Sequence, residues 1–145
     1  MKQIGKKERK KIYEKKSAIY LLVSNQDKQI AVINVEDFGY VLPCGEKDKS
    51  DEEIFNDISI EIGHKLINIK LIDEIRIYYS RKLNDEMVYC DIKANIYTAR
   101  IFGEGNDETI DGHEIVWKRL EALYEKMAID FQGQILENIM RQVSL

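Results

Sequence analysis

The segment of residues 39–63, GYVLPCGEKDKSDEEIFNDISIEIG, constrains the fold more than any other part of the chain. Its pattern predicts a short strand at 40–42, a tight turn at 43–45, a polar loop and then a helix. Ser50 supplies a start signal for the helix and is followed by three acidic residues, which the positive end of the helix dipole favours. Gly63 supplies the stop signal.

The predicted helix has an apolar face and an acidic face. Apolar side chains recur at steps of three and four and are expected to pack inward, namely Ile54, Phe55, Ile58 and Ile62. Glu53, Asp57 and Glu61 are spaced by four and form one carboxylate stripe. Their mutual repulsion, and the position of Glu61 near the negative helix end, would be relieved by a bound cation. A solvated face would tolerate both costs, and charge spacing alone favours that interpretation.

The same segment resembles the signature of the Nudix hydrolase family, in which a strand ends in Leu-Pro-Gly-Gly and a helix reads Arg-Glu-apolar-x-Glu-Glu-x-Gly. The residues that match are Leu42, Pro43, Gly45, Glu61 and Gly63. The departures are Cys44 for a glycine, Asn56 for the arginine, Asp57 for a glutamate and Ile60 for the first glutamate of the pair. Asp48 aligns with the loop glutamate, in a loop shorter than the family pattern.

The resemblance covers roughly residues 17–143 and implies an α/β/α sandwich with a mixed sheet. It implies cleavage of a nucleoside diphosphate linked to another moiety, with Mg²⁺ or Mn²⁺ held by carboxylates and waters. Carried over by position, Asp57 and Glu61 are the catalytic and metal-binding acids, the Gly45 carbonyl is a further ligand, and Glu53 could replace the missing acid. Two predictions stay open, a hydrolase of weak or altered activity and an inactive Nudix-fold module that binds a nucleotide or a partner.

The rest of the chain supplies strands and two later helices. Strands are expected at 17–23 and 30–35 as a hairpin, at 66–79, at 87–102 after a turn at 81–86, and from Glu114 onward; helices are expected at 120–127 and 131–143. Strands lie on both sides of the first helix in the sequence, and two further helices follow the last strand. This order fits an α/β/α sandwich around a mixed sheet. The loop 103–112 is rich in glycine and acids, and a further carboxylate ligand could come from Glu104, Asp107, Glu108, Asp111 or Glu114.

The charge of the chain is unevenly distributed. Residues 1–16 hold eight of the 22 Lys and Arg residues but only two of the 26 Asp and Glu residues. The chain of 145 residues is expected to form one domain. We predict a basic N-terminal arm at 1–16, as a frayed helix or disordered segment, before a Nudix-like domain at 17–145. The arm either contacts RNA or phosphate, or is a solvated leader; the solvated leader is favoured because only Tyr13 supplies an aromatic group.

Several further features bear on location and chemistry. No apolar run is long enough for a membrane span and no secretory signal is recognisable, so a cytoplasmic protein with free thiols at Cys44 and Cys90 is expected. His64 is expected at the surface or capping the helix; His113 could act as a base, but the sequence does not favour that role. Aromatic side chains at Phe38 and Tyr40 are expected in the core rather than stacked on a base. The resemblance also implies a homodimer.

Overall fold

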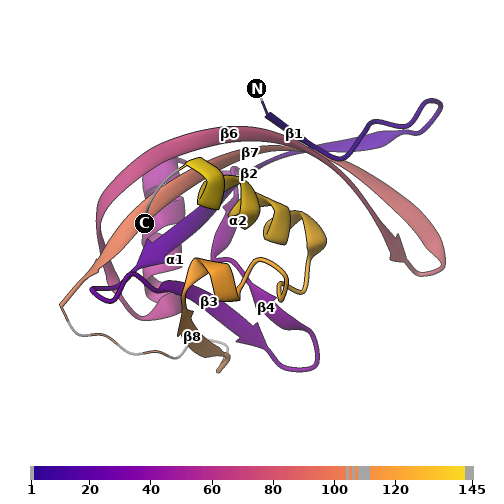
Figure 1. Cartoon of the computed structure of the whole chain (residues 1–145). Coiled ribbons are helices and arrows are strands. Elements are labelled where there is room, and N and C mark those ends of the chain that lie inside the picture. Colours follow the sequence, from indigo (N-terminus) through magenta and orange to yellow (C-terminus); the bar gives the residue numbers. More distant parts are fainter. Residues whose placement is uncertain (1, 104, 106, 108–111, 143–145) are drawn as a thin grey trace.

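The computed structural model describes residues 2–103, 105, 107 and 112–142, and a twisted β-sheet runs through the whole of it (Figure 1). The strands are β1 (Lys2–Ile4), β2 (Tyr13–Ser24), β3 (Ile30–Val35), β4 (Gly39–Val41), β5 (Cys44–Glu46), β6 (Lys65–Leu83), β7 (Glu86–Phe102) and β8 (Glu114–Lys118). The helices are α1 (Asp51–Ile62), the short 3₁₀ helix η1 (Leu120–Ala122) and α2 (Asp130–Gln142).

The sheet is mixed, as predicted. Within the described residues its order is β1-β6-β7-β2-β3-β4, while β5 pairs with β2 and β8 pairs with β3. Strands β2 and β7 run parallel from Tyr13↔Tyr89 to Ser24↔Arg100, and β6 and β7 form a long antiparallel hairpin. Strands β2 and β3 are adjacent and antiparallel, but their register is limited to Ser24↔Ile30, so the two strands of the predicted hairpin diverge at once.

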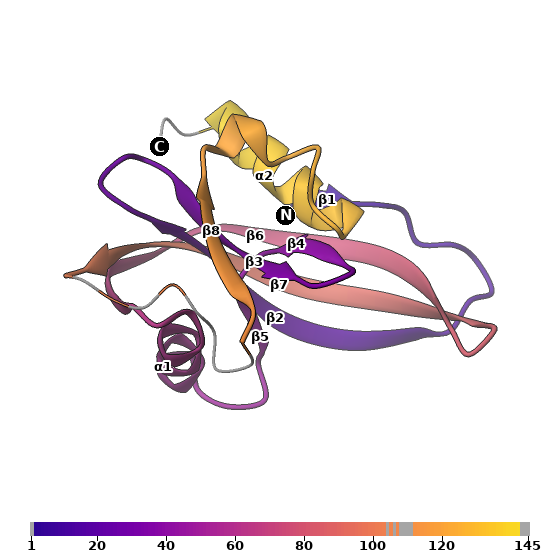
Figure 2. The ribbon, with the colours of Figure 1, turned by 90° about the horizontal axis from the view of Figure 1, so that it is seen from below.

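One helix covers each face of the sheet, α1 on one side and α2 on the other (Figure 2). Successive residues of a strand point to opposite faces, so Ile19, Leu21 and Val23 of β2 pack with α1, whereas Ala18, Tyr20 and Leu22 pack with α2. The inward residues of α1 are Ile54, Ile58 and Ile62, all buried, together with half-buried Phe55. The predicted α/β/α arrangement is therefore confirmed.

The tip of the β6–β7 hairpin is tighter than the predicted turn at 81–86. Leu83 already pairs with Glu86, which leaves a two-residue loop of Asn84 and Asp85. Both residues have positive φ, 51° and 64°. This is the geometry of the two-residue turns whose twist matches that of the flanking strands.

Two interpretations of local sequence were wrong. Residues 2–4 form β1 and residues 13–16 begin β2, because they pair with β6 and β7, so these parts of the basic segment are not a frayed helix or disordered. Their pairing alone does not test the division of the chain at residue 16, which stays a prediction. The helix expected at 120–127 is limited to η1, because Met127 bridges to Tyr40 of β4 and the Ala128 N–H donates to the Tyr40 carbonyl at 2.9 Å.

Among the described residues, no helix is both long enough and apolar enough to cross a membrane. Cys44 and Cys90 are both free thiols, the first exposed and the second buried. Phe38 is 57% exposed, so the expected core position is wrong for it. Tyr40 is half-buried and packs against the core on the α2 side, as expected.

Candidate active site

Helix α1 is fixed at both ends by residues that the sequence indicates. The Ser50 hydroxyl accepts from the Glu53 N–H at 3.2 Å and donates to Glu53 Oε1 at 3.0 Å. Gly63 adopts a left-handed conformation with φ of 73°, and its N–H reaches the last carbonyls of the helix. Because three apolar residues pack this helix onto the sheet, its acidic face has a fixed direction.

Strand β5 lies opposite that acidic face. The sequence predicted a turn and a polar loop here, but Cys44, Gly45 and Glu46 pair with Tyr20, Ile19 and Ala18 of β2. A Cβ atom at Gly45 would lie 2.8 Å from Ile54 Cγ2. Glycine at this position therefore lets β5 approach α1 closely enough to form the wall of a pocket.

The pocket between β5 and α1 has a volume of about 230 Å³ and is lined by both charged and apolar residues. Its charged residues are Glu46, Asp48, Lys49, Asp57 and Glu61, and Gly45 lies among them. The structure thus brings together the three predicted residues Gly45, Asp57 and Glu61. Glu53 does not line this pocket; its side chain is engaged with Ser50, and its role as a ligand stays a prediction.

A cationic side chain of the protein already lies against one of these acids. The Lys49 ammonium forms an ion pair with Asp57 Oδ2. The hydrogen bond to Asp57, and then the charge of that carboxylate, raise the pKa of Lys49 above its usual value. The sequence pattern did not predict this pair, because Lys49 lies before the helix and only the conformation of the loop brings its side chain to Asp57.

The Cys44 thiol lines the same pocket. Desolvation by the surrounding protein, followed by the charges of Glu61 and Glu46, raises the pKa of Cys44 to about 11. A thiol whose ionisation is suppressed in this way is a poor nucleophile at neutral pH. Cys44 is therefore a wall of the pocket rather than a reactive group.

The position of the missing acid is open to solvent. Ile60 is 55% exposed, although it is a large apolar residue on the helix that carries Asp57 and Glu61. Within the described part of the chain, no three His, Cys, Asp or Glu side chains form a group that could hold a metal ion. The pocket therefore holds the two predicted acids, Asp57 and Glu61, beside Glu46 and Asp48, but these described residues do not form the compact group of acids that a metal site needs.

The late acidic loop is used differently from the expectation. Asp107 Oδ1 lies 2.6 Å from His64 Nε2 and accepts from Trp117 Nε1 at 3.1 Å. Partial burial opposes the ionised form of Asp107, but the hydrogen bonds from His64 and Trp117 outweigh it and lower the pKa of the carboxyl group. Asp107 therefore connects the loop to the end of α1 instead of lining the pocket.

His64 is buried, so the surface alternative of the prediction was wrong, but its backbone N–H does cap α1 by donating to the Ser59 carbonyl at 3.2 Å. Its side chain is 7% exposed, its ring lies 5.6 Å from the Trp117 ring, and a Cβ atom at Gly105 would lie 2.6 Å from its Nδ1 atom. Nδ1 is the one buried side-chain polar atom without a hydrogen-bond partner among those of the described residues. The ring thus fills the junction between the helix end and the late loop.

The remaining candidates of this loop take no part in the described pocket. Glu114 is an exposed residue at the start of β8, and His113 is half-buried beside it. Three other predicted acids, Glu104, Glu108 and Asp111, lie outside the described residues.

Comparison with known proteins places this arrangement in a structural context. The sequence matches no protein-family model and no curated protein. The structure is similar to the MutT protein from Bacillus halodurans, with 15% identity, a TM-score of 0.67, and coverage of 90% of this chain and 85% of that one. It is also similar to the MutT protein from Methanosarcina mazei Go1, at 17% identity and a TM-score of 0.62 over 90% and 96% of the chains.

A Nudix hydrolase from Nitrosomonas europaea gives a TM-score of 0.61 at 13% identity, over 88% of this chain and 90% of that one. These matches confirm the predicted resemblance and fold class at the level of three-dimensional structure. The chain has the mixed-sheet α/β fold of the MutT and Nudix hydrolases.

Proposed function

We propose that this protein is a metal-dependent hydrolase of weak or altered activity that cleaves a nucleoside diphosphate linked to another moiety. One observation supports this most: Gly45, Asp57 and Glu61 line a single pocket between β5 and α1. In the sequence Gly45 and Glu61 match the Nudix signature, and Asp57 keeps the charge of a signature glutamate on a shorter side chain. An acidic helix edge turned toward bulk solvent, away from any pocket, would have argued against the proposal.

The donor set suits a hard divalent cation in its chemistry. Carboxylate and carbonyl oxygens are the ligands that Mg²⁺ and Mn²⁺ prefer, and Mg²⁺ is commonly held by one or two carboxylates together with substrate phosphates and waters. Asp57, Glu61 and the Gly45 carbonyl fit that mode. They do not make a complete protein cage, so we infer that the cation is held only together with the diphosphate.

The charge of the pocket supports the same inference. Among the lining residues, Glu46, Asp48, Asp57 and Glu61 outnumber the one cation, Lys49. Glu46 has a further cation beside it, Lys16 at 3.6 Å. The net negative charge of the pocket therefore opposes a diphosphate. A divalent cation, when bound, supplies neutralisation of phosphoryl charge and lowers the pKa of an attacking water. In this proposal the Lys49 ammonium moves from Asp57 to a phosphate oxygen of the substrate. Asp57 is then available as a ligand of the cation.

A second function, a nucleotide-binding module without turnover, is favoured by two specific observations. Ile60 cannot bind a cation and stands where the family pattern has an acid. Lys49 forms an ion pair with Asp57, so a positive charge of the protein itself already neutralises this carboxylate. Binding without hydrolysis would follow if the pair persists when a nucleotide is present.

The two functions are separated by a hydrolysis assay with Mg²⁺ or Mn²⁺ on nucleoside triphosphates and nucleoside diphosphate sugars, with product release followed by chromatography. Asp57→Asn and Glu61→Gln should each abolish turnover, while Glu52→Gln, an exposed acid of the same helix outside the pocket, should leave it unchanged. Calorimetric binding of nucleotide with no turnover in the wild type would favour the binding module. Absence of both binding and turnover at millimolar metal would remove both functions.

A further inference from the structure

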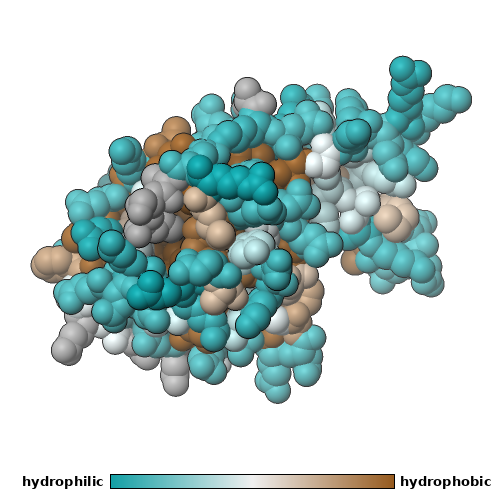
Figure 3. Space-filling model, in the orientation of Figure 1, coloured by the Kyte–Doolittle hydropathy of each residue, from teal (hydrophilic) through white to brown (hydrophobic). Residues whose placement is uncertain are grey.

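The end of the sheet farthest from α1 carries a second site with the opposite charge. Figure 1 shows the hairpin of β6 and β7 and the adjoining start of β2 extending beyond both helices. Strand alternation places Tyr13 and Lys15 of β2 on the same face as Ile19, which packs with α1 farther along the strand. The register sets Tyr89 and Asp91 of β7 directly beside them. No helix covers this end of that face, and Figure 3 shows the end of the molecule beyond the helices as largely hydrophilic.

Three tyrosines from three strands form a cluster on this face. The ring centroids of Tyr13 and Tyr78 are 5.7 Å apart, those of Tyr13 and Tyr89 are 5.6 Å apart, and both pairs meet edge to face. All three side chains are half-buried. The sequence placed only Tyr13 near the basic segment; the sheet brings in the other two from β6 and β7.

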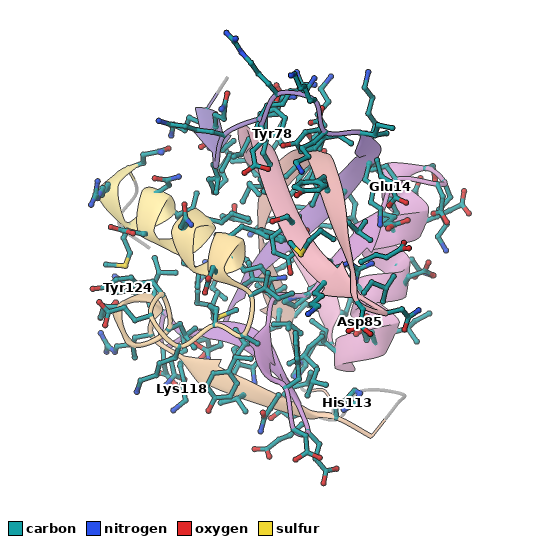
Figure 4. All side chains as sticks on the ribbon, turned by 90° about the vertical axis from the view of Figure 1, so that its right-hand side faces the viewer. Glu14, Tyr78, Asp85, His113, Lys118 and Tyr124 are labelled. Carbon is teal, nitrogen blue, oxygen red and sulfur yellow. The ribbon has the colours of Figure 1, made fainter. Side chains whose placement is uncertain are left out.

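Cations are held over these rings. Lys7 Nζ lies 5.8 Å from the centroid of Tyr13 and Lys11 Nζ lies 5.3 Å from that of Tyr89. The Arg76 guanidinium carbon lies 5.7 Å from the centroid of Tyr78. These are cation–π distances, so the segment between β1 and β2 is folded onto the sheet with its charges beside the aromatic rings. Figure 4 looks onto this end, where nitrogen-tipped side chains gather around Tyr78.

A pocket of about 200 Å³ opens among the same cations. It is lined by Lys15, Lys16, Ser17, Arg76, Asp91 and Lys93. The one carboxylate, Asp91, is 4% exposed and accepts two hydrogen bonds from Arg76, at 3.0 and 2.8 Å. The hydrogen bond from Arg76 outweighs desolvation and lowers the pKa of Asp91, with Lys7 and Lys15 adding to the effect.

This carboxylate therefore does not neutralise the whole pocket. Its charge is taken up by Arg76, whose guanidinium is thereby fixed in orientation. Lys15 and Lys93 are exposed and have no carboxylate within 4 Å among the described residues. The pocket presents a hydroxyl and unpaired ammonium groups to solvent, which is the chemistry of a phosphate site.

We propose that this face binds single-stranded nucleic acid, with phosphates at Lys15, Lys93 and the Arg76 pocket and unpaired bases against the tyrosine cluster. Charge complementarity supports a polyanion, because cations outnumber carboxylates here while the chain as a whole is acidic. Aromatic rings interleaved with cations favour a single strand, because a duplex keeps its base faces stacked inside the helix. The site adjoins the acidic pocket at α1, since Lys16 pairs with Glu46 of that pocket at 3.6 Å, but its proposed function does not depend on the proposed hydrolase.

The test is fluorescence anisotropy of labelled single-stranded RNA and DNA oligonucleotides with the full chain, in EDTA, over a series of salt concentrations. The double variant Lys15→Gln/Lys93→Gln should weaken binding and lower the slope of log K against log salt by about 1.4, because each phosphate contact on a single strand contributes about 0.7. The matched control is Lys28→Gln/Lys126→Gln, which removes the same charge from exposed turns elsewhere. An identical slope in the two double variants would overturn the proposal.

The aromatic part is tested by Tyr89→Leu, with circular dichroism to verify folding. Loss of one stacked base should weaken binding about 5- to 100-fold at unchanged salt slope, whereas Tyr124→Leu at a distant half-buried site should not. Binding of Tyr89→Leu that equals this control would overturn the stacking role. Equal affinity for duplex and single-stranded oligonucleotides would also overturn the proposal. Anionic vesicles are tested as well, because Ile12 beside this face is 93% exposed and could insert into a membrane surface. Binding to vesicles without binding to oligonucleotides would overturn the proposal too.

Discussion

The Lys49 ammonium and the Asp57 carboxylate are ion-paired inside the pocket that also contains Glu61 and Gly45. A carboxylate that a metal would need is thus already engaged by a cation of the protein. Both side chains remain partly exposed, at 42% and 53%. Solvent screens such a pair, so an incoming divalent cation competes with it on favourable terms.

The first prediction concerns this competition. Lys49→Gln should increase the affinity for Mn²⁺ several-fold, measured by calorimetry in the presence of a non-hydrolysable nucleoside diphosphate analogue, because Asp57 no longer has to be released. Lys47→Gln is the matched control, since Lys47 pairs with Asp51 outside the pocket. Because Lys49 is also proposed to donate to a phosphate oxygen, the substitution should weaken binding of the nucleotide analogue itself, which is measured in a separate titration without metal. Equal Mn²⁺ affinities in the two variants would show that the Lys49–Asp57 pair does not matter.

The second prediction restores the acid that the family pattern has at Ile60. Because Ile60 is 55% exposed, Ile60→Glu removes no core packing. Adding a carboxylate one helical turn from Asp57 should raise the Mn²⁺ affinity by about an order of magnitude, since affinity at oxygen sites follows the count of charged ligands. Turnover of the nucleotide substrates should rise with it.

Asn56→Glu controls for simple charge, as it adds an acid to another exposed position of the same helix; neither Asn56 nor Ile60 lines the pocket, but only Ile60 stands where the family pattern has an acid of the pair. A gain of the same size in both variants would mean that long-range attraction, rather than ligation, accounts for the effect.

The third prediction uses Cys44 as a probe of the pocket. Since its pKa is raised to about 11, iodoacetamide should modify it slowly at pH 8, with the rate still rising above pH 10. Glu61→Gln removes the largest charge that raises this pKa and should therefore speed the modification at pH 8 to 9. Peptide mass spectrometry separates Cys44 from the buried Cys90. A rate that responds equally to Glu52→Gln would refute a specific effect of Glu61.

Local signals explain which parts of the fold were predictable. The ends of α1 follow from Ser50 and Gly63, whose side-chain capping and left-handed backbone act within a few residues. The long strand β7 follows from the alternation of apolar residues, because Cys90, Ile92, Ala94 and Ile96 all face one core. The acidic stripe likewise placed Asp57 and Glu61 on the pocket side.

Features that depend on distant partners could not be predicted. Strand β5 has only three residues, and its pairing with β2 rather than its own sequence makes it a strand. His64 and Asp107 are 43 residues apart, and no spacing rule links them. The tyrosine cluster is another example, since the sheet register alone brings Tyr78 and Tyr89 to Tyr13. In each case the sequence supplied the residue type and the tertiary structure supplied the neighbour.

The last prediction concerns the stability contributed by the His64–Asp107 contact. Asp107→Asn should lower the free energy of unfolding at pH 7 by about 1 kcal/mol or less, because the charge-assisted bonds to His64 and Trp117 are lost from a side chain that is 55% exposed. The lowered pKa of Asp107 gives the sign of the pH dependence. Its contribution is present above the ordinary carboxyl pKa of about 4 and is lost as the pH falls through the lower folded value.

Urea unfolding of the wild type and the variant should therefore show a gap at pH 7 that closes toward pH 3. Asp85→Asn is the control, since Asp85 is exposed and its positive φ of 64° suits asparagine equally well. A gap that persists unchanged at pH 3 would mean that the substitution acts through packing at the loop rather than through the charge of Asp107. Such a result would leave His64 as a packing residue whose ring, and not its hydrogen bond, joins the end of α1 to the late loop.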